Sequence, residues 1–141
     1  MNGKTLKEIY EYDFVSEDGE SNIEPWFNSV MLKTPEQLTV ADLCRMLRQR
    51  IFSVVAIEQA IGVIKNDPFA GDIYEGQLMV SLCKGKEKYL APRYKDIAPL
   101  LDMAALQAKS HKWESENEKE IFLLVIQEFA KKIRESEEIV L

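Results

Sequence analysis

The side chains that could carry out catalysis are few in this sequence and lie far apart. His111 is the single histidine, and it has no Cys, Ser or Asp partner at a known catalytic spacing. Cys44 and Cys83 are too few and too distant from each other for a metal site, which needs clustered ligands. We therefore expect a structural or exposed histidine, two buried free thiols, and no metal or other cofactor.

Known catalytic motifs are also missing from the sequence. It has no glycine-rich phosphate loop, no nucleophile elbow, no His-Glu-x-x-His and no Cys-x-x-Cys. Carboxylates are abundant, and a glycosidase-like pair of them, distant in sequence, remains an alternative. Taken together, these patterns predict a protein that is not an enzyme.

Acidic side chains are the most prominent chemical feature of the chain. Its formal net charge is −6, and residues 11–24 hold several carboxylates and no basic residue. Such a charge disfavours nucleic acid as a direct partner, because phosphate binding needs clustered Lys and Arg. It favours a basic protein partner, which the negative field would attract. A solvated connector is the simpler interpretation of residues 11–24, and a binding surface for a cationic cleft is the alternative.

Two groups of residues are candidates for contact with a basic partner. The first group comes from the acidic run and comprises Asp13, Glu17, Asp18, Glu20 and Glu24. The second group follows the turn at Gly71 and comprises Asp72, Tyr74 and Glu75. In the second group, Asp72 and Glu75 also have the spacing of a helix cap, so a purely structural role is the alternative there.

The elements that position these residues are predicted to be helices. Thr39 followed by Asp42 is typical of a helix N-terminus, because the hydroxyl and the carboxylate can each accept an early backbone N–H. Apolar residues then recur at three- and four-residue steps, which places them on one helical face. These residues are Val40, Leu43, Cys44, Leu47 and Ile51.

Two more helices are expected in the middle of the chain. Residues 53–66 are apolar nearly all round, so this helix would be buried between others, with Gly62 permitting a close approach. Pro68 prevents its continuation. A third helix is predicted to begin at a cap made by Asp72 and Glu75 and to end at Gly85. Its apolar residues would be Ile73, Leu78, Met79 and Leu82.

Capping signals predict a helix near each end of the chain. Thr5 with Glu8 indicates a short helix over residues 5–12, and Ser115 with Glu118 indicates a last helix over residues 115–135. The apolar stripe of the last helix is expected to be Ile121, Leu124, Val125, Phe129 and Ile133, widened by Phe122 and Ile126.

Three further segments are interpreted from composition. Trp26 and Phe27 are expected to pack at the edge of the core, with an exposed aromatic anchor as the alternative. Residues 84–95 are basic and contain tyrosines and a proline, which favours a solvated loop over a stacking surface for nucleic acid. Pro99 fits the first turn of a helix that follows Asp96 and continues to Lys109.

The predicted fold class is all-α, a single domain over residues 1–141 built as a bundle of five to seven helices. No convincing alternation of apolar and polar residues indicates a strand. No N-terminal signal and no apolar run long enough to span a membrane is present, so a cytoplasmic location is expected.

The stretch from Leu38 to Leu82 resembles the immunity proteins of bacterial contact-dependent growth inhibition (CDI) systems. The resemblance lies in LTVADLCRMLRQ and in AIEQAIGVIKNDPFAGDIYEGQLM. The matching positions are Leu38, Thr39, Val40, Asp42, Leu43, Gln49, Asp67, Pro68, Ala70, Tyr74, Gly76 and Leu78. The chain departs from the family pattern at Cys44, where Arg is common, at Gln77, where Asp is common, and in lacking a proline within residues 52–56.

The resemblance implies a cytoplasmic protein that binds and neutralises the cognate C-terminal toxin domain of a CDI effector. The inhibitor would block the active site or the substrate-binding surface of the toxin, as a monomer in a 1:1 complex. A nuclease is the expected toxin. If the toxin is a nuclease, its cleft must be cationic, and acidic residues of the inhibitor could mimic phosphate. The alternative is a helical adaptor that binds an amphipathic segment of another protein through an apolar groove.

Overall fold

The computed structural model describes residues 3–11 and 25–140, the side chains of residues 138–140 excepted. The regular secondary structure of these residues is helical, with no strand. The elements in chain order are α1 (Leu6–Ile9), α2 (Pro25–Met31), the 3-10 turn η1 (Pro35–Gln37), α3 (Val40–Gln49), α4 (Ser53–Asn66), α5 (Gln77–Cys83), α6 (Glu87–Leu90), the 3-10 turn η2 (Ala91–Arg93), α7 (Tyr94–Ala108) and α8 (Glu116–Val140). α6, η2 and α7 follow one another without a break. Counted as one body, they leave seven α-helical bodies in the described residues, and the predicted all-α class is confirmed.

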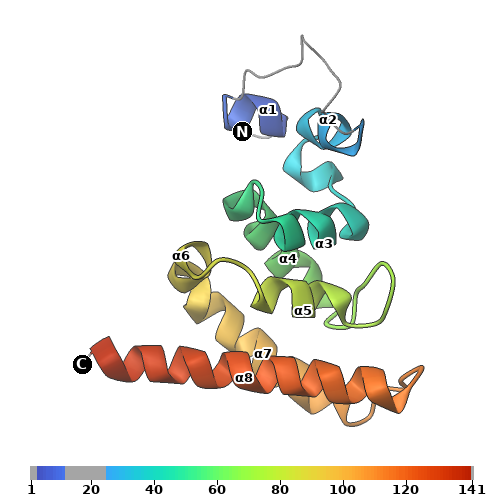
Figure 1. Ribbon diagram of the computed structural model, residues 1–141, viewed down its shortest axis with the longest axis vertical. Coiled ribbons are helices and arrows are strands. Elements are labelled where there is room, and N and C mark those ends of the chain that lie inside the picture. Colours follow the sequence, from blue (N-terminus) through green and yellow to red (C-terminus); the bar gives the residue numbers. More distant parts are fainter. Residues whose placement is uncertain (1–2, 12–24, 141) are drawn as a thin grey trace.

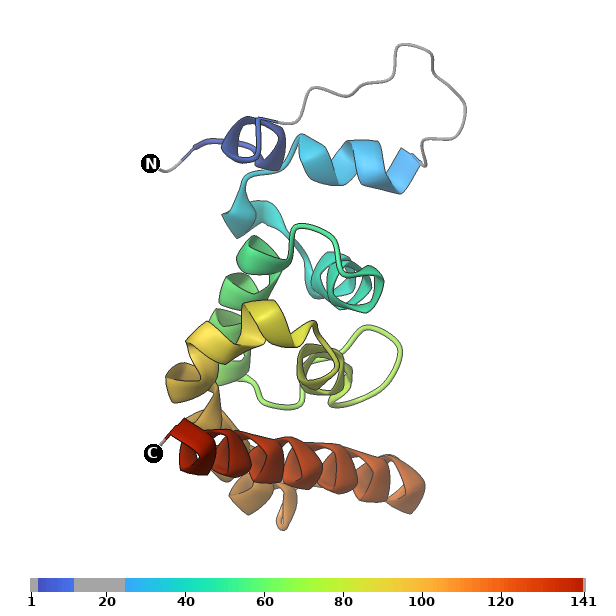
Figure 2. The ribbon, with the colours of Figure 1, turned by 60° about the vertical axis from the view of Figure 1, so that its left-hand side comes forward.

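The helices are arranged in layers along the long axis of the molecule (Figure 1). α1 and α2 form one end, α3 and α4 follow, then α5 and α6, and the long α8 lies across α7 at the other end (Figure 2). α5 packs against α3 and α4 on one side and against α8 on the other. The short helix α5 therefore connects the middle of the molecule to its C-terminal end.

α3 and α4 form the middle layer much as their sequence predicts. Leu43, Cys44 and Leu47 are buried on the predicted face of α3, and Met46 is buried as well because α3 packs against both α4 and α5. α4 has the predicted bounds, but Gly62 is exposed, and a Cβ placed there would meet no atom within 4 Å. The expectation of a close helix approach at Gly62 was therefore wrong.

The apolar stripe of α8 differs from the one expected. The N-terminus is as predicted, since the Glu118 N–H donates to Ser115 Oγ at 3.1 Å, but the helix continues beyond residue 135. Ile121 and Leu124 are 46% and 55% exposed, whereas the buried residues are Phe122, Ile126, Phe129 and Ile133. α8 packs against α7 and α5. This contact buries only a narrow stripe of the helix, so the rest of its wide apolar face stays partly in solvent.

Residues 84–95 do not form the predicted loop. They belong largely to α6, η2 and the start of α7, and the reason is that Leu90 and Tyr94 are buried and anchor the segment to the core. Pro99 lies inside α7, not in its first turn, because the helix begins five residues earlier, at Tyr94. The two cysteines are free, as predicted, with Cys44 buried and Cys83 half-buried.

The carboxylate of Asp42 holds the N-terminal layers together. Trp26 Nε1 donates to it at 3.0 Å, Lys33 Nζ at 2.6 Å and the Thr39 N–H at 3.0 Å. The Arg45 guanidinium lies 4.3 Å from the centre of the Trp26 ring, so Trp26 packs against the core as expected. One side chain thus caps α3 and ties α2 to it. The predicted caps Thr5–Glu8 and Thr39–Asp42 both form.

Replacing Asp42 by Asn should destabilise the fold by about 2 kcal/mol, because it removes charge-assisted hydrogen bonds from a buried site. Burial alone would raise the pKa of Asp42, but the hydrogen bonds from Lys33, Thr39 and Trp26 outweigh it and lower the pKa. The carboxylate therefore stabilises the fold above its unfolded pKa of about 3.9, and this contribution is lost as the pH falls through the lower folded pKa. Urea unfolding of both proteins between pH 7 and pH 2.5 should show their difference shrinking with acid. A constant difference would contradict this account.

Replacing Gly62 by Ala should stabilise the fold by about 0.5–1 kcal/mol, because the helical site is open and Ala restricts the unfolded chain. Thermal unfolding monitored by circular dichroism measures the effect. A lower melting temperature would mean that α4 is covered at Gly62 after all.

Candidate functional site

A loop over residues 67–76 joins α4 to α5 and folds back on itself. The Phe69 N–H donates to Asp67 Oδ1 at 3.1 Å, and the Gly76 N–H donates to the Phe69 carbonyl at 2.9 Å. α5 begins only at Gln77, and Ile73 is 77% exposed. The predicted third helix therefore exists with Leu78, Met79 and Leu82 buried, but its predicted start at a cap made by Asp72 and Glu75 was wrong.

The side chain of Gln77 closes this loop. Gln77 is only 6% exposed, and its Oε1 accepts the N–H groups of Asp72 at 2.8 Å and of Ile73 at 2.7 Å. Without this acceptor, two backbone donors in a tight turn would lose their partner. The sequence predicted that carboxylates would accept backbone N–H groups at the start of a helix. The amide oxygen of Gln77 accepts such groups instead, and they belong to the loop and not to the helix.

Two glycines allow the loop to pack tightly. A Cβ on Gly71 would lie 1.9 Å from the Tyr74 carbonyl oxygen. Gly76 has a φ of 81°, and its Cβ would lie 2.5 Å from Cδ1 of Phe122 on α8. The loop backbone is thus pressed against α8 at Gly76.

Aromatic packing and Glu75 fix the loop to the segment before α8. The Phe69 ring stacks on His111 with ring centres 4.0 Å apart and also contacts Trp113. His111 Nε2 lies 3.1 Å from one Glu75 oxygen, and the Glu114 N–H donates to the other at 3.2 Å. His111 is therefore a structural residue, as predicted, and Glu75 positions the loop.

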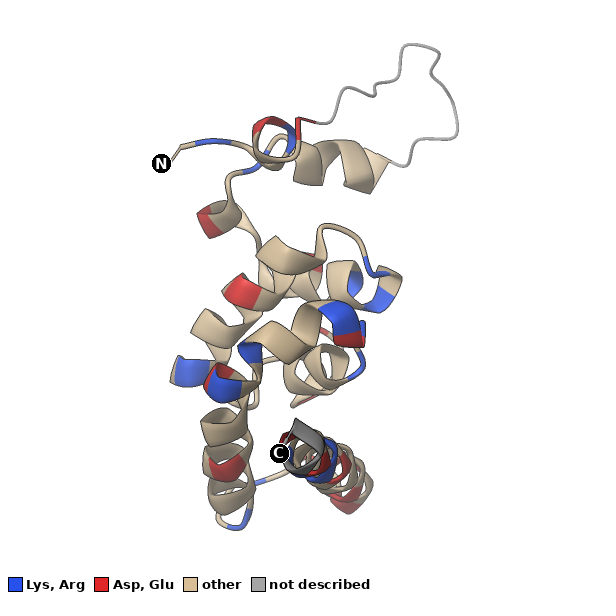
Figure 3. Cartoon of the chain, turned by 90° about the vertical axis from the view of Figure 1, so that its left-hand side faces the viewer, with Lys and Arg blue, Asp and Glu red and all other residues tan. Residues whose placement is uncertain are grey.

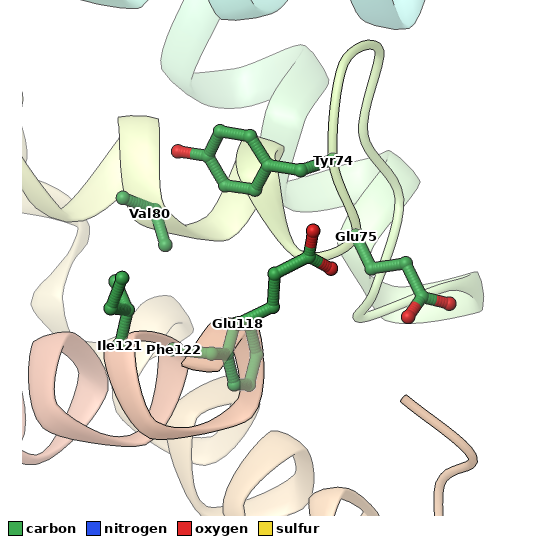
Figure 4. Close-up of a pocket in the computed structure, with 6 residues that line it drawn as sticks. All are labelled: Tyr74, Glu75, Val80, Glu118, Ile121 and Phe122. Carbon is green, nitrogen blue, oxygen red and sulfur yellow. The ribbon is translucent and has the colours of Figure 1, made fainter. Parts of the chain in front are cut away.

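Tyr74 lies where three hollows meet, which we call apolar, acidic and basic. The apolar hollow, of about 300 Å³, is lined by Tyr74, Glu75, Val80, Glu118, Ile121 and Phe122 (Figure 4). The acidic hollow, also about 300 Å³, includes Asp72, Tyr74, Glu75, Glu114 and Glu118 in its lining. The basic hollow, about 470 Å³, includes Arg48, Arg50, Tyr74, Gln77, Ser81 and Lys84. A partner that covers Tyr74 would therefore meet surfaces of three different characters.

Close to Tyr74, one carboxylate oxygen of Glu118 accepts no hydrogen bond from the described residues. Its Oε1 is buried and has no hydrogen-bond partner among the described residues. Figure 4 shows the Glu118 carboxylate directed toward Tyr74, while the Glu75 side chain points away. Burial, together with the electrostatic influence of Cys44 and Glu118, raises the pKa of Tyr74. The phenol therefore stays protonated at neutral pH and can donate a hydrogen bond.

The predicted site residues have different outcomes. Asp13, Glu17, Asp18, Glu20 and Glu24 lie outside the described residues. Asp72 and Tyr74 are exposed on the loop, and Glu75 is half-buried. The sequence reasoning missed Glu114, Glu118 and Ile121, which tertiary packing alone brings to this loop, and it did not connect Arg48 and Arg50 with Lys84. The only sequence signal at Glu118 was its spacing from Ser115, which pointed to a cap.

Metal-ligand clusters and membrane-spanning helices are both missing from the described part of the chain. Within it, no three His, Cys, Asp or Glu side chains are grouped so that they could hold a metal ion. None of its helices combines the length and the apolar character that crossing a membrane requires.

Replacing Gly76 by Ala should destabilise the fold by at least about 2 kcal/mol, since the left-handed backbone and the contact with Phe122 both resist a methyl group. Gly62→Ala, the same change at an open site, is the matched control and should not destabilise. Equal melting temperatures for the two variants would show that the loop does not press on α8.

The comparison with protein families supplies the identity. The model of a family described as CDI immunity proteins matches residues 8–100, about two thirds of the chain. The match runs from α1 into α7 and so includes the loop over residues 67–76 and every residue of the basic hollow. No curated protein matched in a separate search. Members of this family are non-enzymatic toxin binders, and the chain belongs to the CDI immunity proteins.

Proposed function

We propose that this immunity protein neutralises a nuclease toxin by covering its active site or substrate-binding surface with the face around Tyr74. The family implies binding of the cognate C-terminal toxin domain of a CDI effector. We further propose a 1:1 complex in the cytoplasm, where a nuclease would meet its substrate.

The observation that supports this proposal most is the grouping of carboxylates beside Tyr74. Asp72, Glu114 and Glu118 come from two distant parts of the chain and line one hollow. The Asp72 side chain forms no hydrogen bond or ion pair with the described residues. A cationic nuclease cleft would attract such carboxylates, which can take the place of substrate phosphates.

The rigidity of the loop supports the same proposal. Gln77 holds the loop to α5, and Glu75 holds it to the segment before α8, so little conformational entropy is lost when a partner binds Tyr74. Tyrosine is among the residues that contribute most to protein interfaces when it is central to them. We assign toxin contact to Asp72 and Tyr74 and a positioning role to Glu75. Asp13, Glu17, Asp18, Glu20 and Glu24 stay candidates for a second acidic contact.

One observation favours the alternative of a helical adaptor. Ile121, which lines the apolar hollow, and Leu124, three residues further along α8, leave much of their side chains in solvent. An amphipathic helix of a partner could cover them. Binding through that surface would be insensitive to salt, whereas binding through carboxylates should weaken as ionic strength rises.

The proposal is tested by co-expressing the chain with the toxin domain encoded next to it in a sensitive host. We expect growth to be rescued and a complex to be purified whose affinity falls with salt. Toxicity that persists despite soluble immunity protein would overturn the proposal. A complex whose affinity does not change between low and high salt would favour the adaptor.

Within that complex, Tyr74→Ala and Asp72→Asn should each raise the Kd about tenfold or more, the first mainly through faster dissociation. Surface plasmon resonance at two salt concentrations measures both rates. The matched control is Asp102→Asn, because Asp102 is an exposed carboxylate on α7 that lines none of the three hollows. Wild-type affinity in the Tyr74 and Asp72 variants would place the interface elsewhere.

A further inference from the structure

The basic hollow has a lining unlike the rest of this acidic protein. Arg48, Arg50 and Lys84 border it, and no carboxylate does. These three residues come from the end of α3 and the end of α5, which pack against each other. Figure 3 shows basic positions gathered in these middle layers of a chain whose net charge is −6.

The remaining polar groups in the hollow can also donate hydrogen bonds. Gln77 Oε1 is occupied by two loop N–H groups, which fixes the orientation of the amide. The group that Gln77 can still offer is therefore its NH2, a donor. Ser81 and Tyr74 add hydroxyls. A hollow lined by cations and donors is complementary to an oxyanion.

Arg50 is held at this position by the backbone. It ends α3 with a φ of 60° and a ψ of 45°, the left-handed conformation that ordinary residues seldom adopt. Its Nη2 donates to the Lys84 carbonyl at 3.1 Å, so the guanidinium spans from α3 to the end of α5. This bond uses one of the five N–H donors of the guanidinium, so the other four remain available for a ligand.

Tyr74 couples this hollow to the proposed interface, because it lines the basic and the acidic hollow alike. A toxin that covers Tyr74 would remove water from Arg48, Arg50 and Lys84 as well. Three cations that lose their hydration without a counter-charge would oppose binding. The partner must therefore supply an anion on this side of Tyr74.

We propose that the basic hollow is an oxyanion-binding site that receives a carboxylate side chain of the toxin. This inference rests on the proposed function. It makes the toxin surface bipolar, with cations opposite the acidic hollow and a carboxylate opposite the basic one. Such a pattern would also exclude toxins that are uniformly basic, because their cations would face Arg48 and Lys84.

The site itself is tested without the toxin, by titrating the ¹⁵N-labelled protein with sodium acetate and with inorganic phosphate at constant ionic strength. We expect saturable shifts of the backbone amides of residues 77–84 with both anions. Arg48→Gln/Lys84→Gln should abolish saturation, while Lys95→Gln/Lys131→Gln, which removes the same charge outside the hollow, should retain it. Absence of saturable shifts in the wild type, or equal loss in both double variants, would overturn the oxyanion site.

A second variant separates the donor role of Gln77 from its structural role. Gln77→Glu keeps an oxygen for the Asp72 and Ile73 N–H groups but replaces the NH2 donor by a carboxylate. We expect a folded loop, judged by unchanged amide shifts of residues 71–76, and binding of acetate weakened at least tenfold. Unweakened binding in a folded variant would count against the assignment.

The source of the anion is tested in the complex with the toxin domain. Arg48→Gln/Lys84→Gln should raise the Kd at least tenfold, and Lys95→Gln/Lys131→Gln should leave it within twofold of the wild type. Wild-type affinity in the first variant would overturn the proposal that a toxin carboxylate binds in the basic hollow, although the proposed function would stand. If the wild-type protein formed no complex, the proposed function and the toxin carboxylate would both fall, and the titration would still decide the oxyanion site.

Discussion

The amide of Gln77 is the contact on which the proposed binding face depends. One buried oxygen accepts two consecutive backbone N–H groups and so sets the path of residues 71–76. That path places Tyr74 over the junction of three hollows and turns Glu75 toward His111. The same constraint leaves the NH2 of Gln77 for the basic hollow, so a single side chain serves both the fold and the proposed site.

The layered architecture explains how residues far apart in sequence meet at Tyr74. α5 lies between α3 and α8, and each neighbour contributes one charge type: the end of α3 supplies arginines, and the start of α8 supplies carboxylates. Tyr74 precedes α5 and lines both the hollow with the arginines and the hollow with the carboxylates. A face of mixed charge in an overall acidic protein allows strong attraction at long range and discrimination at contact.

The prediction of α8 shows where sequence patterns lose their force. Its apolar residues cover a wide arc, and helical periodicity alone favoured Ile121 and Leu124 over Phe122 and Ile126. The structure buries Phe122 because the Gly76 backbone and Phe69 press against it from the loop. Ile121, which is left partly exposed, then lines the apolar hollow. The choice between the two faces required contacts that lie some fifty residues apart in the chain.

By itself, the sequence determined the helical class, the bounds of α4 and the caps Thr5–Glu8 and Thr39–Asp42, because these depend on interactions three or four residues apart. It also carried enough of the family pattern to indicate an immunity protein. The tertiary structure alone decided that Gln77 closes the loop, that Glu118 and Arg48 each line a hollow shared with Tyr74, and that Gly62 faces solvent. These outcomes depend on which helix packs against which, and no local spacing contains that information.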